Sequence, residues 1–64
     1  MSEKLLLDAV EAAQLIGVSR SRIFRLIQNE ELESIKVGGL RRIPRTAAHA
    51  FVDRMIEQAR SEVA

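Results

Sequence analysis

The 64-residue sequence contains no cysteine, no tryptophan and no tyrosine. Because cysteine is absent, neither a disulfide framework nor a zinc site with thiolate ligands can form, which favours a reducing compartment. Long apolar runs are absent too: the run at residues 5–7 is far shorter than a secretory signal or the ~20 apolar residues of a membrane span. The sequence therefore predicts a cytoplasmic protein that does not enter a membrane.

Aromatic residues make up 3% of the chain, whereas hydrophobic residues of all kinds make up 47%. Aliphatic side chains must therefore fill the core, with Phe24 and Phe51 expected as its two large rings. At this length we expect one domain covering residues 1–64, and so small a core cannot easily spare the contacts that a catalytic cleft removes. Neither a catalytic triad nor a glycine-rich phosphate loop is present. The sequence therefore predicts a protein that is not an enzyme and has no cofactor.

Two features of the sequence could be mistaken for a metal site. His49 is the single histidine, and no second ligand accompanies it in the sequence. Glu30, Glu31 and Glu33 form an acidic cluster without a nucleophile or a metal partner, and solvated turn charges explain it better. We therefore expect no bound metal.

The formal net charge is only +1, but the basic residues are concentrated in the middle of the chain. Positions 20 to 45 contain seven basic and three acidic residues, whereas acidic residues outnumber basic ones on both sides of this window. Such a focused positive charge is typical of a nucleic-acid-binding surface. The seven basic residues are Arg20, Arg22, Arg25, Lys36, Arg41, Arg42 and Arg45.

The first part of the chain has the pattern of a capped helix. Asp8 and Glu11 have the spacing of a capping box, in which each side chain accepts a hydrogen bond from the other residue's amide. Strong helix formers follow, and Gly17 suits the left-handed residue that ends a helix. We expect this helix at residues 9–16. Its apolar stripe runs through Val10, Ala13 and Ile16 or Gly17.

A second helix is expected to begin after Ser19, a good N-cap residue, and to end near Asn29 or Glu30. After it, Leu32 can return to the core. The apolar residues of this helix share one face at helical spacing, and they are Ile23, Leu26 and Ile27. Arg20 and Phe24 fall on its flanks. The opposite face carries Ser21, Arg22, Arg25, Gln28 and Asn29.

A β-hairpin is expected next. Residues 34–37 alternate polar and apolar, as a half-buried strand does, and Gly38-Gly39 is a strong two-residue turn. Residues 40–43 form the return strand, with Ile43 facing inward beside Ile35 or Val37.

A third helix is expected at residues 47–60. Pro44 ends the preceding strand and suits the entry to a helix, and residues 61–64 are expected to fray. The apolar face of this helix contains Ala48, Phe51, Val52, Met55 and Ile56.

The residues around Gly17 have the spacing of a helix-turn-helix. Ala13 is small enough to let the second helix approach, and Gly17 permits the turn between the helices. Val18, Ile23 and Leu26 can then wedge the two helices together, which presents the second helix to the major groove of DNA. The predicted fold is α+β, a small winged helix-turn-helix of three helices with a two-stranded β-hairpin wing.

The outward face of the second helix and the hairpin supply the candidate DNA contacts. Arginine can donate to guanine or phosphate and Gln or Asn can pair with adenine, while arginines near a wing tip suit the adjacent minor groove. The alternatives are a solvated helix face and edge-strand charges that prevent aggregation. The predicted residues are Ser19, Arg20, Ser21, Arg22, Arg25, Gln28 and Asn29 on the helix, and Lys36, Gly39, Arg41 and Arg42 on the wing.

Segments from Leu5 to about Arg54 match the pattern of a known family. They are Leu6-Leu7-Asp8, Glu11-Ala12-Ala13, residues 15–21, Phe24-Arg25-Leu26-Ile27, Ile35-Lys36-Val37-Gly38-Gly39 and Arg41-Arg42-Ile43-Pro44-Arg45. In this combination the sequence resembles the excisionase and MerR-like winged helix-turn-helix domains. Two positions depart from the family pattern: Phe24 stands where tyrosine is frequent, and Leu40 stands where a polar or basic residue is common.

The resemblance implies a phage or mobile-element excisionase, also called a recombination directionality factor. Such a protein would bind repeated sites beside an attachment site, self-associate cooperatively on DNA, bend it and contact a tyrosine integrase. Integrase-mediated DNA excision in the bacterial host cell would thereby be favoured. Two other functions stay open: a small transcriptional regulator of the same fold, and a protein-interaction module that acts through the apolar face of the third helix.

Overall fold

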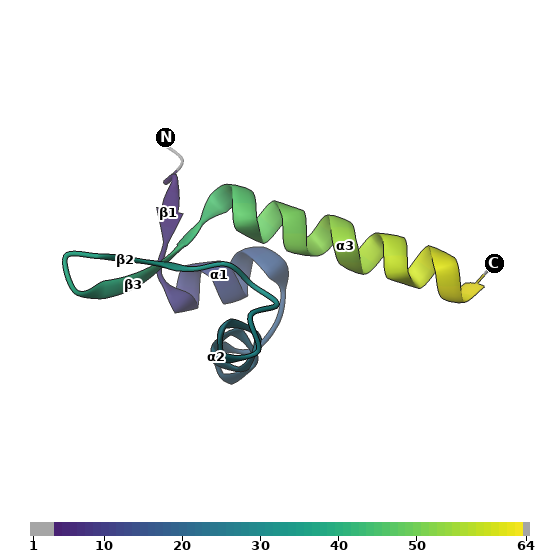
Figure 1. Ribbon diagram of the computed structural model, residues 1–64, viewed down its shortest axis with the longest axis horizontal. Helices are drawn as coiled ribbons and strands as arrows, with labels where there is room; N and C mark the ends of the chain where they lie inside the picture. The colour runs from purple at the N-terminus through teal and green to yellow at the C-terminus, as the bar shows by residue number, and fades with distance from the viewer. Residues whose placement is uncertain (1–3, 64) are drawn as a thin grey trace.

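The computed structural model describes residues 4–63 and has an α+β architecture (Figure 1). The elements in chain order are β1 (Leu6–Leu7), α1 (Ala9–Ile16), α2 (Arg20–Gln28), β2 (Ile35–Val37), β3 (Leu40–Pro44) and α3 (Arg45–Val63). The three strands form an antiparallel sheet in the order β1-β3-β2. The winged helix-turn-helix predicted from the sequence is therefore confirmed, with a third strand added to the hairpin.

The α1 helix has the predicted bounds because both of its ends are capped locally. The Glu11 amide donates to Asp8 Oδ1 at 2.8 Å, and the Asp8 amide donates to Glu11 Oε1 at 3.0 Å. At the other end Gly17 has a φ of 92° and its amide donates to the Ala13 carbonyl. The expected apolar stripe is wrong in part, since Val10 is 44% exposed. Ala13 is buried as expected and Ala12 is buried as well, because small side chains let α1 lie close to its neighbours.

The α2 helix begins at the Ser19 cap, whose Oγ accepts a hydrogen bond from the Arg22 amide at 3.2 Å. Ile23 and Leu26 are buried on its inner face. After the helix ends, Glu30 adopts a left-handed backbone conformation with a φ of 59°. This turn returns the chain to the core, where Leu32 is buried as predicted.

The β1 strand was not expected from the sequence, and it corrects the predicted position of Ile43. Ile43 is fully buried, but its partner in the sheet is Leu7 of β1. Ile35 and Val37 are 39% and 46% exposed, so β2 is not the half-buried strand that its alternation suggested. The reason is that the hairpin projects beyond the core, as Figure 1 shows.

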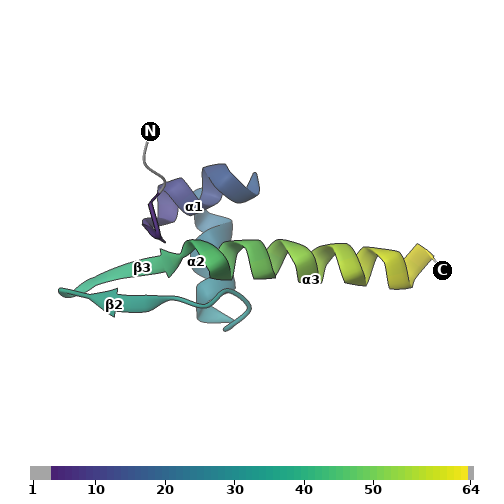
Figure 2. The ribbon, with the colours of Figure 1, turned by 90° about the horizontal axis from the view of Figure 1, so that it is seen from above.

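The α3 helix is longer than predicted at both ends. Pro44 is the last residue of β3, and the helix runs without a break from Arg45 to Val63. Residues 61–63 are thus helical rather than frayed, whereas Ala64 lies outside the described residues. Ala47, Ala48 and Phe51 are buried, but the later part of the helix extends away from the core, opposite to the hairpin (Figure 2).

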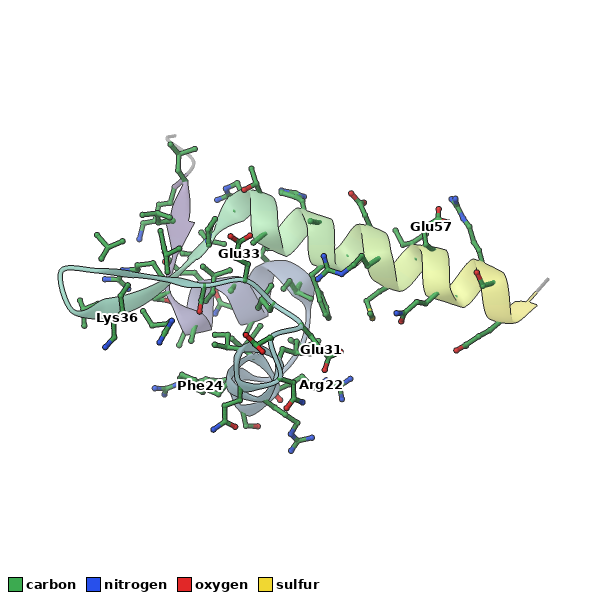
Figure 3. All side chains as sticks on the ribbon, in the orientation of Figure 1. Arg22, Phe24, Glu31, Glu33, Lys36 and Glu57 are labelled. Carbon is green, nitrogen blue, oxygen red and sulfur yellow. The ribbon has the colours of Figure 1, made fainter. Side chains whose placement is uncertain are left out.

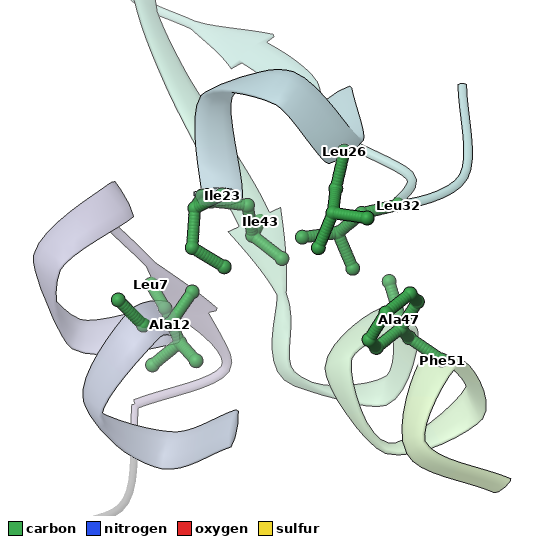
Figure 4. Close-up of a cluster of buried hydrophobic side chains, with 9 residues drawn as sticks. Leu7, Ala12, Ile23, Leu26, Leu32, Ile43, Ala47 and Phe51 are labelled. Atoms are coloured by element: carbon green, nitrogen blue, oxygen red, sulfur yellow. The ribbon is translucent and has the colours of Figure 1, made fainter. Parts of the chain in front are cut away.

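A single hydrophobic core holds these elements together (Figure 4). The second expected ring is missing from it, because Phe24 is 47% exposed on α2. Aliphatic side chains and Phe51 fill the interior instead. Within residues 4–63, no helix has the length and apolar character needed to cross a membrane. The buried residues of the cluster are Leu7, Ala12, Ala13, Ile23, Leu26, Leu32, Ile43, Ala47 and Phe51.

Candidate nucleic-acid interface

The exposed face of α2 is polar and basic along its whole length. Ser21, Arg25 and Gln28 are exposed and follow one another at helical spacing, so they form the centre of this face. The helix contains three arginines and no acidic residue. Its outer surface therefore presents hydrogen-bond donors and positive charge, and no carboxylate of the same helix neutralises that charge.

The beginning of α2 adds hydroxyl groups to this face. Ser19 Oγ caps the helix, and it lies 3.3 Å from Ser21 Oγ. The first amides of a helix point outward with the positive end of the helix dipole, which suits phosphate oxygens. Ser19 is thus first a structural cap, and any phosphate contact of its hydroxyl would be additional to that role.

The flanks of α2 differ in chemistry. Figure 3 shows Arg22 and Phe24 on opposite sides of the helix, with Phe24 on the side of the hairpin. The Arg20 guanidinium lies over the Phe24 ring, 5.6 Å from its centroid. Phe24 was expected in the core because aromatic residues are so scarce. The helical spacing, which places Phe24 on a flank, was the better indication.

The wing places its two neighbouring arginines on opposite faces. Lys36 is the register partner of Arg41, whereas Arg42 is the partner of Ile35. Successive residues of a strand point to opposite faces, so Lys36 and Arg41 share one face and Arg42 lies on the other. Lys36 projects from the hairpin toward the side on which α2 lies (Figure 3).

One hydrogen bond and one turn conformation further define the wing. Arg41 Nη1 donates to Ser34 Oγ at 3.3 Å, which ties the arginine to the start of the hairpin. Gly39, with a φ of 83°, belongs to the turn, so this predicted site residue contributes backbone shape. A glycine is the residue that adopts this conformation at least cost.

Arg42 lies near an ion pair formed by the N-terminal segment and α1. Lys4 Nζ is 2.6 Å from Glu11 Oε2. The hydrogen bond to Glu11 raises the pKa of Lys4, and the like charge of Arg42 opposes this rise. The hydrogen bond from Lys4 lowers the pKa of Glu11, and the Asp8 amide and the charge of Arg42 lower it further. The charge of Arg42 therefore acts on this ion pair, and the residue lies on the face of the hairpin opposite to Lys36 and Arg41.

The acidic residues between α2 and β2 lie beside the end of α2, since Gln28 and Arg41 line the same groove as they do. Glu30, Glu31 and Glu33 line a groove between this loop and α3, with Phe51 at its apolar wall. Arg54 Nη2 donates to the Glu31 carbonyl at 2.6 Å and fastens the loop to α3. Within the described part of the chain, no group of three His, Cys, Asp or Glu residues could hold a metal ion.

Comparison with known proteins identifies the family. A family model described as a helix-turn-helix domain matches residues 6–58. The chain is 35% identical over 54 residues to an excisionase of Streptomyces ambofaciens, and the match covers 84% of this chain and 87% of that protein. The chain belongs to the excisionase-type helix-turn-helix family.

A second excisionase-type relative is longer. A protein of Saccharopolyspora erythraea described as a probable excisionase is 40% identical over 58 residues, which is 91% of this chain but only 59% of that protein. No solved structure matches the chain at a significant level. Because proteins of this helix-turn-helix family bind DNA and are not enzymes, membership confirms the predictions of family and of a non-enzymatic protein.

For this excisionase-type domain, the structure gathers most of the predicted site residues but separates some. The outer face of α2 and the Lys36–Arg41 face of the wing lie on the same side of the molecule (Figure 3). Arg22 projects from the flank of α2 opposite to Phe24, and Asn29 is the C-cap residue of the helix. Arg42 lies on the other face of the hairpin. Exposed Phe24 lies at the edge of this candidate interface, and it was not among the predicted site residues.

Proposed function

We propose that this chain is a DNA-binding excisionase whose α2 enters the major groove while the wing contacts the neighbouring minor groove. The observation that carries the proposal is the exposed face of α2, a helix with three arginines and no acidic residue, on the same side as Lys36 and Arg41. Family membership supports it, since the relatives are named as excisionases.

The position of each side chain on α2 suggests its role. Arg25 is central on the exposed face, where a guanidinium can donate two hydrogen bonds to guanine. Gln28, one turn further along, can pair with adenine in the same groove. Arg22 and Asn29 are nearer the edge of the face, where phosphates border the groove, and Ser21 with the helix amides also suits phosphate.

The groove-reading role of Arg25 can be tested by binding measurements on a duplex selected from a random pool. Arg25→Ala should lower the affinity about 5- to 150-fold, as expected for loss of a bidentate base contact worth about 1–3 kcal/mol, and should relax the preference at one base pair. Arg60→Ala is the matched control, because Arg60 is an exposed arginine on distant α3 whose guanidinium pairs with Glu57 of the same helix.

Two outcomes of this experiment would argue against the proposal at different levels. Equal weakening on all sequences would make Arg25 a phosphate contact rather than a base contact. No binding to any duplex at micromolar protein would remove the DNA-binding function altogether. In that case a protein-interaction module acting through α3 would become the better hypothesis.

The finer proposal is that the protein assembles cooperatively on repeated sites beside an attachment site, bends the DNA and contacts a tyrosine integrase. The exposed distal part of α3 supports a protein contact: Ile56 is 44% exposed on a segment that extends beyond the core (Figure 1). Such a surface can be covered by integrase or by a neighbouring protomer.

These finer steps need separate measurements. Bending is measured by the mobility of duplexes in which the site is moved from the end to the middle. Excision is measured with the integrase of the same element on a plasmid that carries both attachment sites, with and without the protein. Stimulated excision, reduced by Ile56→Glu without a change in DNA affinity, is the expected result. Binding at a promoter without an effect on excision would favour the transcriptional regulator.

A further inference from the structure

Phe24 is an apolar residue in the middle of a polar surface. It is one of two aromatic residues in the chain, and the other, Phe51, is buried in the core. Phe24 is 47% exposed, on the flank of α2 that faces the wing (Figure 3). Its neighbours on the outer surface are serine, arginine and glutamine. The fold gains little from a ring that remains in water, so the side chain is available for an apolar contact with a partner.

Arg20 gives this ring a defined environment. Its guanidinium lies 5.6 Å from the ring centroid, within the range of a cation–π contact. The arginine covers one part of the ring and leaves the rest accessible, in agreement with the exposed fraction of Phe24. The pair therefore combines a positive charge and an apolar surface at the edge of the proposed DNA-binding face.

The chemistry of a phenyl ring limits what it can recognise on DNA. A phenyl ring has no hydrogen-bond donor or acceptor for a phosphate or for a polar base edge. In the major groove the apolar group presented by a base pair is the C5 methyl of thymine, and phenylalanine is one of the side chains that contact it. We propose that Phe24 is a specificity-determining residue that reads a thymine methyl at the wing-side edge of the site contacted by α2. This inference rests on the proposed DNA-binding function.

The methyl contact can be tested by removing one methyl group from the DNA and the ring from the protein. In the selected duplex each thymine is replaced singly by deoxyuridine, which keeps base pairing and lacks only the C5 methyl. The affinity of the unmodified protein should fall about fourfold at one thymine, since burial of one methyl is worth about one buried CH₂. Phe24→Ala should bind the thymine and deoxyuridine duplexes equally at that position.

Two further variants keep the test interpretable. Phe24→Leu retains an apolar side chain and should retain part of the thymine preference. Leu15→Ala removes an equally exposed apolar side chain from α1, where Leu15 is 44% exposed, and should leave the preference unchanged. Thermal unfolding of each variant shows whether the fold is intact, which is expected because Phe24 lies outside the buried cluster.

The outcomes separate this inference from the proposed function. If the protein binds DNA but no deoxyuridine replacement alters the affinity, Phe24 does not read a methyl group. The same conclusion follows if Phe24→Ala is as sensitive to the replacement as the unmodified protein. If no duplex is bound, the DNA-binding function itself fails. A fourfold loss that disappears in Phe24→Ala supports the inference.

Discussion

Lys36 and Arg41 are directly opposite each other in the hairpin, so a change at either should affect stability and DNA affinity in opposite directions. They are register partners on one face of the β2–β3 pair. In the free protein two positive charges therefore face each other, which destabilises a sheet by about 0.2–1 kcal/mol. DNA phosphates would neutralise both charges. Arg41→Ala should consequently stabilise the free domain and weaken its complex with DNA.

The size of both effects can be worked out from this arrangement. One phosphate contact contributes about 0.9 to the slope of log K against log salt concentration. Arg41→Ala should reduce the slope by about 0.9, and the double variant with Lys36→Ala by about 1.8. Relief of about 0.5 kcal/mol of repulsion should raise the Tm by about 2–4 °C in a domain of this length. The exposed hydrogen bond to Ser34 is long, at 3.3 Å, and offsets little of this gain.

The assay needs a duplex long enough to extend beneath the wing as well as α2. Fluorescence anisotropy at four salt concentrations gives the slope, and circular dichroism gives the Tm of the free protein. Arg42→Ala provides a matched comparison, because the same charge is removed from the next residue on the opposite face. It should leave the salt slope unchanged.

Several results would refute this reasoning. An equal loss of slope for Arg41→Ala and Arg42→Ala would mean that DNA contacts both faces of the hairpin. An unchanged slope for Arg41→Ala would mean that the wing does not contact phosphate. A lower Tm for Arg41→Ala would show that the arginine contributes a stabilising contact larger than the repulsion from Lys36.

Three other predictions concern stability and can be followed by thermal unfolding. Glu30→Gly should stabilise the domain by about 1 kcal/mol, because glycine adopts the left-handed backbone of this turn (φ 59°) without strain; an unchanged Tm would contradict this. Leu32→Ala should destabilise it by about 2–5 kcal/mol, since Leu32 is 1% exposed, whereas a loss below 1 kcal/mol would mean that the site collapses. The pKa of Glu11 is lowered by folding, so its stabilisation is present above its usual value of 4.5 and is lost as the pH falls through the lowered pKa. The pKa of Lys4 is raised, so its contribution to stability is lost only as the pH rises above the usual value of 10.5. Glu11→Gln should therefore make the decrease of Tm at acid pH less steep, while the other carboxyl groups still titrate.

The helix-turn-helix was predictable because the residues that define it are close in sequence. Each of these helix ends is set by residues within one turn of it. They are the capping box at Asp8 and Glu11, the left-handed Gly17 and the Ser19 cap. Such local hydrogen bonds do not depend on the rest of the fold. The bounds of α1 are therefore those expected, and α2 ends within a residue or two of the expected position.

The strand β1 and the buried partner of Ile43 were not predictable in the same way. A two-residue strand has too little alternation to be recognised, and Leu7 meets Ile43 only when residues far apart in sequence come together. Without β1, the sequence offered Ile35 and Val37 as the partners of Ile43. The exposure of these two residues also follows from the tertiary structure, because no element among residues 4–63 covers the outer part of the hairpin.

In the candidate site, too, some features follow from nearby residues and others from the pairing of strands. Which α2 residues face outward follows from the helical repeat, so Ser21, Arg25 and Gln28 could be predicted from sequence. Which arginine of the wing shares a face with Lys36 depends on the register, and the register follows from the glycine turn. Since Gly38-Gly39 is a two-residue turn, it fixes Val37 opposite Leu40 and hence Lys36 opposite Arg41. The separation of Arg41 from Arg42 could thus have been derived from the sequence by carrying the turn through to the pairing.

The wing is held in position relative to α2 by contacts at both of its ends. At one end, the loop after α2 is anchored by buried Leu32 and by the hydrogen bond from Arg54 to the Glu31 carbonyl. At the other, Ile43 is buried and paired with Leu7. The charged side chains of the proposed interface take no part in the buried core. Changes to those charges should therefore alter affinity without unfolding the protein, whereas loosening either anchor should disturb the spacing between helix and wing even though the anchors themselves lie outside the proposed interface.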